Sequence, residues 1–204
     1  MTEIAIVLGN GRSRLGLDLA ALKSFGRVYG CNALYREFAP DVLVSTDAGI
    51  SEEIQQSGYS KDNLHYTRKP IDGLGSQTID RLLYGYSSGP VAMGLAAREH
   101  SYVYFAGFDL KGDDGKINNI YAGTAHYKPA DAAATYYGNW VRQVAEVMRQ
   151  HPNKKFIRIV DHGHLTPDDW HNHACYSEMR ITEFVDMLNN KRTLNHEHNE
   201  KNHR

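Results

Sequence analysis

Short hydrophobic runs alternate along this chain with segments in which hydrophobic residues recur at helical spacing. The runs cover residues 4–8, 27–31, 41–45, 102–106 and 156–160. Apolar runs of roughly five residues are typical of strands that are buried on both faces of a parallel sheet. The pattern therefore predicts a sheet of this kind, with the intervening segments supplying helices.

The intervening segments predict where the helices lie. Helices are expected over residues 17–22, from Ser88 to Arg98, over 130–149 and over 177–188, with a further short strand over 63–67. We therefore expect one α/β domain over residues 1–190, a Rossmann-like fold with helices on both faces of a mostly parallel sheet. Residues 191–204 are polar and histidine-bearing without an apolar face, and are expected to be disordered.

Composition excludes several classes of function. The 204 residues are 41% hydrophobic and 23% charged, and the formal net charge of −1 gives no overall electrostatic footprint for nucleic acid or anionic membranes. The two cysteines, Cys31 and Cys175, do not suggest a disulfide scaffold. We expect a cytoplasmic protein without a signal peptide or membrane span, and a homo-oligomer remains open.

The first strand runs directly into a glycine turn, Gly9-Asn10-Gly11. Two glycines allow the backbone to approach a ligand closely, and the N–H groups of a following helix favour an anion. The stretch is neither the dinucleotide fingerprint, which needs a third glycine, nor a Walker A loop, which needs Gly-Lys-Ser/Thr. It predicts a nucleotide- or phosphate-binding corner, and the alternative is a tight turn without a ligand.

Polar residues follow the predicted strands at their carboxyl ends, where ligands bind in such folds. They are Asn10, Asn32, Asp47, Asp109 and Asp161. An asparagine offers both a donor and an acceptor, so it can bind a base edge or ribose hydroxyls. These residues predict the lining of a site, although asparagine and aspartate are also common in turns and caps.

Ser87, Ser88 and Gly89 open a predicted helix and form a second candidate anion cradle. The alternative is a simple helix cap. Two long loops, residues 66–84 and 111–127, contain several glycines. Loops of this length in a compact domain are usually functional lids or disordered segments.

Five short motifs occur in a characteristic order. They are Gly9-Asn10-Gly11-Arg12-Ser13-Arg14, Cys31-Asn32-Ala33-Leu34-Tyr35, Ser87-Ser88-Gly89, Ala106-Gly107-Phe108-Asp109-Leu110, and His126 before a helix. Together they resemble the bacterial CMP-sialic-acid-dependent sialyltransferases of the Campylobacter lipooligosaccharide type and the wider set of proteins that share their nucleotide-binding core. The resemblance spans Ile4 to about residue 145.

The resemblance implies an inverting, metal-independent glycosyltransferase that uses a CMP-type sugar donor and needs no other cofactor. In it, His126 would be the general base, which suits a side chain that titrates near neutral pH. The acceptor could be a glycan, a protein, a lipid-linked sugar or a modified base in nucleic acid. Gly9 of the turn, Asp47 at a strand end and Ser87 of the cradle are added to the residues that the resemblance implies. The predicted nucleotide-binding residues are therefore Gly9, Asn10, Gly11, Ser13, Asn32, Asp47, Ser87, Ser88, Gly89 and Asp109.

The chain also departs from this family. Arg12 replaces a proline, and Lys111 stands where the first of two phosphate-binding tyrosines would be, with Tyr121 as the second. A lysine could still neutralise the leaving phosphate, so Lys111 and Tyr121 join His126 as predicted catalytic residues. Archaeal pterin diphosphokinases and flagellin-modifying factors share the first motif.

Two other functions therefore stay open. One is a Mg²⁺-dependent diphosphokinase acting on a pterin-like molecule, with ATP and the metal held by carboxylates such as Asp47 and Asp109. The other is a nucleotide-binding module without catalytic activity.

A histidine-rich segment near the C-terminal end is the remaining candidate site. It contains His162, His164, His171 and His173. Imidazoles and carboxylates bind zinc and similar ions, but this spacing matches no familiar zinc pattern, so these four are weak metal candidates. The alternatives are a polar loop, or a histidine that binds the donor's phosphate or carboxylate.

Overall fold

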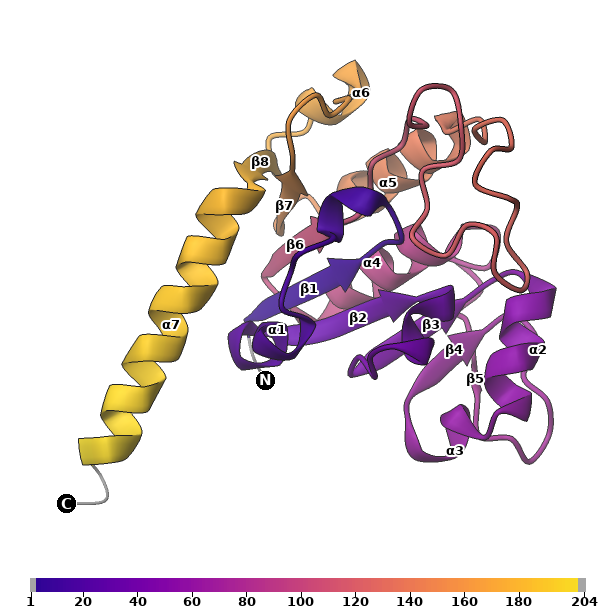
Figure 1. Cartoon of the computed structure of the whole chain (residues 1–204), viewed down its shortest axis with the longest axis horizontal. Helices are drawn as coiled ribbons and strands as arrows, with labels where there is room; N and C mark the ends of the chain where they lie inside the picture. Colours follow the sequence, from indigo (N-terminus) through magenta and orange to yellow (C-terminus); the bar gives the residue numbers. More distant parts are fainter. Residues whose placement is uncertain (1–2, 202–204) are drawn as a thin grey trace.

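The computed structural model describes residues 3–201 and the side chains of residues 3–191 (Figure 1). In this part of the chain, eight strands form one sheet in the order β5-β4-β3-β2-β1-β6-β7-β8, and every neighbouring pair is parallel. The strands are β1 (Ile4–Leu8), β2 (Arg27–Cys31), β3 (Val42–Ser45), β4 (His65–Thr67), β5 (Gln77–Thr78), β6 (Tyr102–Ala106), β7 (Lys155–Val160) and β8 (Tyr176–Arg180).

The helices connect these strands. They are α1 (Leu19–Phe25), α2 (Ala48–Gln56), α3 (Tyr59–Asp62), α4 (Ser88–Glu99), α5 (Gly138–Gln150), α6 (Asp168–His171) and α7 (Ile181–Lys201), with the 3-10 turns η1 (Arg12–Arg14) and η2 (Asn32–Arg36). The fold is thus the predicted Rossmann-like α/β domain. No helix in the described part of the chain has the length and apolar character needed to cross a membrane.

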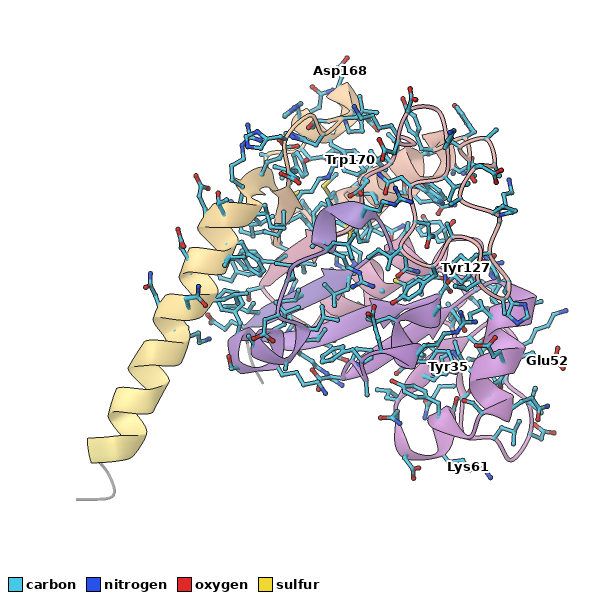
Figure 2. All side chains as sticks on the ribbon, in the orientation of Figure 1. Tyr35, Glu52, Lys61, Tyr127, Asp168 and Trp170 are labelled. Atoms are coloured by element: carbon cyan, nitrogen blue, oxygen red, sulfur yellow. The ribbon has the colours of Figure 1, made fainter. Side chains whose placement is uncertain are left out.

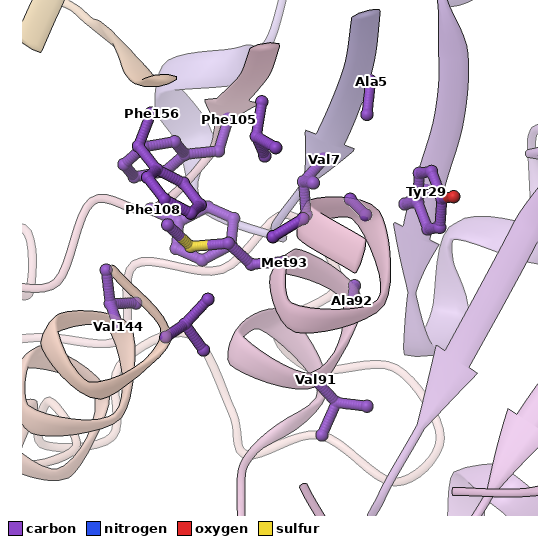
Figure 3. Close-up of a cluster of buried hydrophobic side chains, with 14 of the residues drawn as sticks. Ala5, Val7, Tyr29, Val91, Ala92, Met93, Phe105, Phe108, Val144 and Phe156 are labelled. Carbon is purple, nitrogen blue, oxygen red and sulfur yellow. The ribbon is translucent and has the colours of Figure 1, made fainter. Parts of the chain in front are cut away.

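Alternating strand residues build two cores, one on each face of the sheet. In β1, Ala5 and Val7 pack toward α4 and α5, as Figure 3 shows for Val7 beside Met93 of α4. Ile6 and Leu8 pack on the other face, which α1, α2 and α7 cover. Because successive side chains of a strand point to opposite faces, a continuous apolar run serves both cores.

The chain changes direction between β1 and β6. From β1 it proceeds outward through β2, β3, β4 and β5, and then returns to place β6 on the other side of β1. In open α/β sheets the crevice at such a switch point is the usual ligand site. The loops after β1 and β6 therefore border the expected functional edge.

Two predicted helices differ from the structure. The helix expected over 130–149 begins only at Gly138, because residues 132–134 instead bond to residues 115–117, through Ile117 N–H to the Ala132 carbonyl at 3.0 Å and a matching bond from Ala134 to Gly115 at 2.9 Å. The helix expected over 177–188 was also wrong in part, since Tyr176–Arg180 forms β8 against β7 and α7 starts afterwards.

The C-terminal tail also differs from the expectation of disorder. Helix α7 continues to Lys201, so the backbone of residues 191–201 is helical. Residues 202–204 lie outside the described part of the chain. The sequence pattern missed this because the tail has no apolar face of its own, whereas a helix that has already started can continue by adding one backbone hydrogen bond per residue.

Candidate functional site at the carboxyl edge of the sheet

The glycine turn after β1 packs against the loop after β6. Gly9 N–H donates to the Ala106 carbonyl at 2.8 Å, and Gly11 N–H donates to the Gly107 carbonyl at 2.9 Å. A Cβ atom added at Gly9 would lie 2.5 Å from the Gly107 oxygen. The two predicted glycines are therefore required by the contact between two loops, which brings the switch-point loops together.

Ser13 and Asp109, both predicted to bind nucleotide, bind each other. The Ser13 backbone N–H donates to one carboxylate oxygen of Asp109 at 2.9 Å, and its hydroxyl donates to the other. A Cβ on Gly11 would lie 2.4 Å from the Asp109 carboxyl carbon. This carboxylate thus holds the turn after β1 in place. Such a structural role requires no ligand.

A second group of predicted residues meets at the start of α4. The Ser88 hydroxyl donates to the Asn32 side-chain oxygen at 2.8 Å and accepts the Thr46 backbone N–H at 3.0 Å. Asn32 has a φ of 52°, a left-handed conformation that asparagine tolerates better than most residues. Gly89 follows, where an added Cβ would lie 3.1 Å from the Phe108 ring. The ends of β2 and β3 are thereby joined to the N-terminus of a 12-residue helix.

The remaining members of the predicted set lie around this group. Ser87 is the N-cap residue of α4 without a side-chain cap bond, and its backbone N–H donates to Gln143 at 2.9 Å. Asp47 is exposed as the N-cap residue of α2. The side-chain oxygen of Asn10 is buried without a hydrogen-bond partner among the described residues. A buried acceptor without a partner is costly, and a bound ligand is one way to satisfy it.

A long segment between β6 and α5, residues 107–137, crosses the carboxyl edge of the sheet, and we call it the covering loop (Figure 1). Ile120 N–H donates to the Asn10 carbonyl at 2.8 Å. The hydroxyl of Tyr127, labelled in Figure 2, accepts the Ala33 N–H at 3.2 Å, and burial raises the pKa of Tyr127 to about 12. The covering loop thus lies over the ends of β1 and β2.

Tyr121 anchors the covering loop from below. Its hydroxyl donates to Glu37 and accepts from Arg14 at 2.9 Å, while Arg14 also donates to Glu37 at 3.0 Å and to the Gly9 carbonyl at 2.8 Å. Burial, reinforced by the bond to Glu37, raises the pKa of Tyr121. The single proton of this hydroxyl is thus used in the bond to Glu37.

His126 is carried by the covering loop onto helix α2. Its Nε2 lies 3.1 Å from Oε2 of Glu53, and its φ is 69°, a left-handed conformation. The ring rests on Gly49, where an added Cβ would lie 2.5 Å from Nδ1. A carboxylate on Nε2 favours the tautomer with the proton there, which leaves the lone pair on Nδ1.

Glu53 is held as a carboxylate by its other neighbours. Arg36 donates to it at 2.8 and 2.9 Å, and the hydroxyl of Tyr35 donates at 2.5 Å. Partial burial alone would raise the pKa of Glu53. The hydrogen bonds and the positive charge of Arg36 have the larger, opposite effect, so the net pKa of Glu53 lies below its usual range. His126 therefore has a charged, fixed partner.

Lys111 lies elsewhere, in a cleft of about 370 Å³ between the loops that follow β1, β6 and β7. Ser13, Asp109 and Asp161 also line this cleft. The three residues predicted to be catalytic all belong to the covering loop, but their side chains face different places: Lys111 lines the cleft, Tyr121 is buried against Arg14 and Glu37, and His126 contacts α2. Of the predicted set, the structure brings together Asn32, Ser88 and Gly89 on one side of the β1 turn, and Ser13, Asp109 and Lys111 on the other.

The histidines of the histidine-rich segment also lie in different places. His162 and His164 line the cleft, and the His164 ring lies 3.0 Å from Glu178 and 2.9 Å from the Asp161 carbonyl. His171 belongs to α6 and packs edge-on against Tyr176. Among the described residues, no three His, Cys, Asp or Glu side chains gather in a way that could hold a metal ion.

Sequence reasoning missed Glu53, Arg14 and Thr46. Arg14 is nearly fully buried, at 3% exposure, which a charged residue after a glycine turn does not suggest. Glu53 follows another glutamate, Glu52, on the same helix, and only the path of the covering loop distinguishes them. Figure 2 shows Glu52 pointing away from the molecule.

We compared the chain with protein families, curated proteins and solved structures. No family model, no curated protein and no solved structure matches the chain. The site must therefore be interpreted from its own geometry.

Proposed function

We propose that this protein transfers a sugar from a CMP-type nucleotide sugar to an acceptor hydroxyl, with inversion at the anomeric carbon. The observation that carries the proposal is the contact between His126 and the ionised Glu53 at the covered carboxyl edge of the sheet. A histidine oriented by a carboxylate is a common arrangement for a general base.

The nucleotide would lie beneath the covering loop, between the β1 turn and the start of α4. Asn10 and Asn32 supply amide groups there, and the α4 N-terminus supplies a positive dipole end for a phosphate, while the Ser88 hydroxyl holds Asn32 in place. The unpartnered oxygen of Asn10 supports a ligand with a donor group in this place, such as an amino group of a base or a ribose hydroxyl.

In the proposed reaction, Nδ1 of His126 takes the proton of the acceptor hydroxyl. The acceptor oxygen then bonds to the anomeric carbon from the face opposite the leaving group, and the bond from that carbon to the phosphate oxygen breaks. CMP leaves with the electron pair, and the proton remains on the imidazolium beside Glu53, whose charge stabilises it. Glu53 acts as a positioning residue. Tyr121 and Lys111 have no part in this scheme.

The geometry gives less support to a diphosphokinase. Asp47 follows β3 and Asp109 follows β6, and these strands are three positions apart in the sheet. At roughly 4.8 Å per strand, the two ends are separated by about 14 Å, which is too far for one Mg²⁺ to bridge both carboxylates. Both oxygens of Asp109 are also occupied by Ser13.

The test is the release of CMP from CMP-sugars, with EDTA present, by the wild-type protein and by single variants. We expect His126→Ala to lower the rate by about 10²–10⁴-fold, the usual contribution of a general base. The exposed His171→Ala serves as the control, with an unchanged rate. A folded His126→Ala protein with full activity would sink the assignment, and CMP binding without any turnover would favour a binding module.

Glu53 offers a second test with a closely matched control. Glu53→Gln removes the charge beside His126, and Glu52→Gln removes an equal charge one residue away on the exposed face of α2. We expect only Glu53→Gln to lower the rate across the pH–rate profile, because Glu53 and not Glu52 contacts His126 and fixes the orientation of its ring. Equal profiles for both variants would contradict the positioning role.

A further inference from the structure

The cleft between the loops after β1, β6 and β7 lies at the switch point of the sheet, on the other side of the β1 turn from Asn32 and Ser88. The chain leaves β1 toward α1 on one face and leaves β6 toward α5 on the other, so these loops diverge there. Such a position is where open α/β sheets usually bind ligands. None of the steps proposed for His126 uses this cleft.

Several charged groups of the cleft are already engaged within the protein. The Asp109 carboxylate is bound by Ser13, and Asp113 pairs with Arg12 at 3.5 Å across the open rim. Arg158 lies 2% exposed at the floor, donates to the Leu165 and Phe108 carbonyls, and packs over the Trp170 ring. These groups shape the cleft and leave little for a ligand.

Other lining groups have no partner within the described part of the chain. They are the ammonium of Lys111, the imidazole of His162 and one carboxylate oxygen of Asp161, whose other oxygen accepts the His162 backbone N–H at 2.7 Å. Two of the three guanidinium nitrogens of Arg12 are likewise unused. The residues that line the cleft include no phenylalanine, tyrosine or tryptophan, so the cleft offers no large aromatic surface to a flat ring.

We propose that this cleft is a second ligand site, and that it takes a small polyhydroxylated molecule carrying one anionic group, such as a sugar phosphate or a sugar acid. Lys111 and Arg12 bind the anionic group, and Asp161 accepts hydrogen bonds from hydroxyls. His162 donates to or accepts from a further hydroxyl. The volume of about 370 Å³ lies at the small end of ligand sites, which fits one sugar unit.

The experiment is a titration of the ¹⁵N-labelled full chain, followed by NMR, with glucose 6-phosphate, glucuronate, glucose and inorganic phosphate in separate samples. Gly112 and Gly163 line the cleft, whereas Gly49 and Gly89 lie at the proposed nucleotide site. We expect glucose 6-phosphate or glucuronate to shift the Gly112 and Gly163 amide signals and to leave those of Gly49 and Gly89 in place. The two compounds distinguish phosphate from carboxylate.

Three outcomes would overturn the proposal: no shift with any probe, glucose binding as tightly as the anionic sugars, or inorganic phosphate binding as tightly as glucose 6-phosphate. The first excludes a site, the second excludes recognition of the anion, and the third excludes recognition of hydroxyls. Because the readout is binding at named glycines, these results are independent of whether CMP-sugars are turned over.

Variants test the residues directly. Lys111→Met is expected to weaken binding of the better anionic sugar by about tenfold, the usual effect of losing one charge-assisted hydrogen bond. Asp161→Asn is expected to weaken it as well, while inorganic phosphate is unaffected. The control is Lys155→Met, since Lys155 is exposed at the opposite end of β7. An equal loss in Lys155→Met and Lys111→Met would contradict the assignment.

Discussion

His65 is fully buried in β4, and both nitrogens of its ring face serine hydroxyls. Nε2 lies 2.7 Å from Ser45, and Nδ1 lies 2.8 Å from Ser76 and 3.0 Å from Ser60. Burial lowers the pKa of His65 to about 4. The imidazole is therefore neutral in the folded protein at any pH where the protein is expected to work, and it serves the structure rather than catalysis.

This environment predicts a stability that falls with acid. Between pH 6.5 and 4 the unfolded chain binds a proton on His65 and the folded chain does not, so the free energy of unfolding decreases as the pH decreases. From pH 7.5 to 5 we expect His65 alone to account for a loss of about 2 kcal/mol. Urea denaturation at both pH values measures it.

The comparison for this prediction is between variants. His65→Gln lowers stability at neutral pH but is expected to lose this part of the acid dependence, whereas the exposed His171→Gln keeps the wild-type dependence. An acid dependence in His65→Gln that equals that of the wild-type protein would show that His65 does not titrate in this way.

Single residues also mark where prediction from the sequence stops. The chain order places Ser13 and Asp109 at the same edge, because both follow strands of a parallel sheet. It does not show that they bind each other, since that depends on the close contact of Gly9 and Gly107 across the β1–β6 pair. The sequence therefore predicts where a strand-end aspartate lies, but not which group it binds.

Among the secondary-structure elements, α7 shows how one helix is held to the sheet. Phe184 is fully buried and packs edge-on against Phe25 of α1 at 5.6 Å between ring centres, and stacks on Tyr104 of β6 at 5.7 Å. Leu188, one turn later, belongs to the same core. The first two turns thus attach α7, since Ile181, Val185 and Met187 also pack partly buried against this core, and beyond Leu188 the sequence is polar apart from Leu194.

We predict that Phe184→Ala lowers the free energy of unfolding by about 3–5 kcal/mol, because it leaves a cavity between three elements. Leu82→Ala is the control, since Leu82 is 72% exposed and should change stability by less than about 0.5 kcal/mol. Chemical denaturation measures both. A Phe184→Ala protein as stable as Leu82→Ala would mean that α7 does not pack on the sheet in solution.

The elements that prediction missed are those decided by distant contacts. Tyr176-Ser177-Glu178-Met179-Arg180 has no apolar run, and it becomes a strand because β7 offers it an edge. Ala132, Ala133 and Ala134 favour a helix by propensity, yet they pair with the other arm of the covering loop. The strands with continuous apolar runs could be predicted, because burial on both faces of a sheet leaves an apolar run within the strand's own sequence.

In the whole molecule, the position of the β1 turn organises the candidate chemistry. It lies between the group formed by Asn32 and Ser88 on one side and the cleft with Lys111 on the other, and the covering loop passes over it. The order of the strands could be inferred only in part from sequence, as the pattern predicts parallel strands but not that β6 returns beside β1. That return creates the switch point.

The most direct test is a thermal-unfolding comparison of the wild-type protein and Asn10→Ala, each alone, with CMP plus EDTA, and with ATP plus Mg²⁺. Without ligand, Asn10→Ala should be as stable as the wild type or more stable, since it removes a buried oxygen without a partner. We predict that CMP raises the melting temperature of the wild-type protein and not that of Asn10→Ala. Stabilisation only by ATP with Mg²⁺, or an equal CMP response in both proteins, would contradict a CMP-type donor at the carboxyl edge of this sheet.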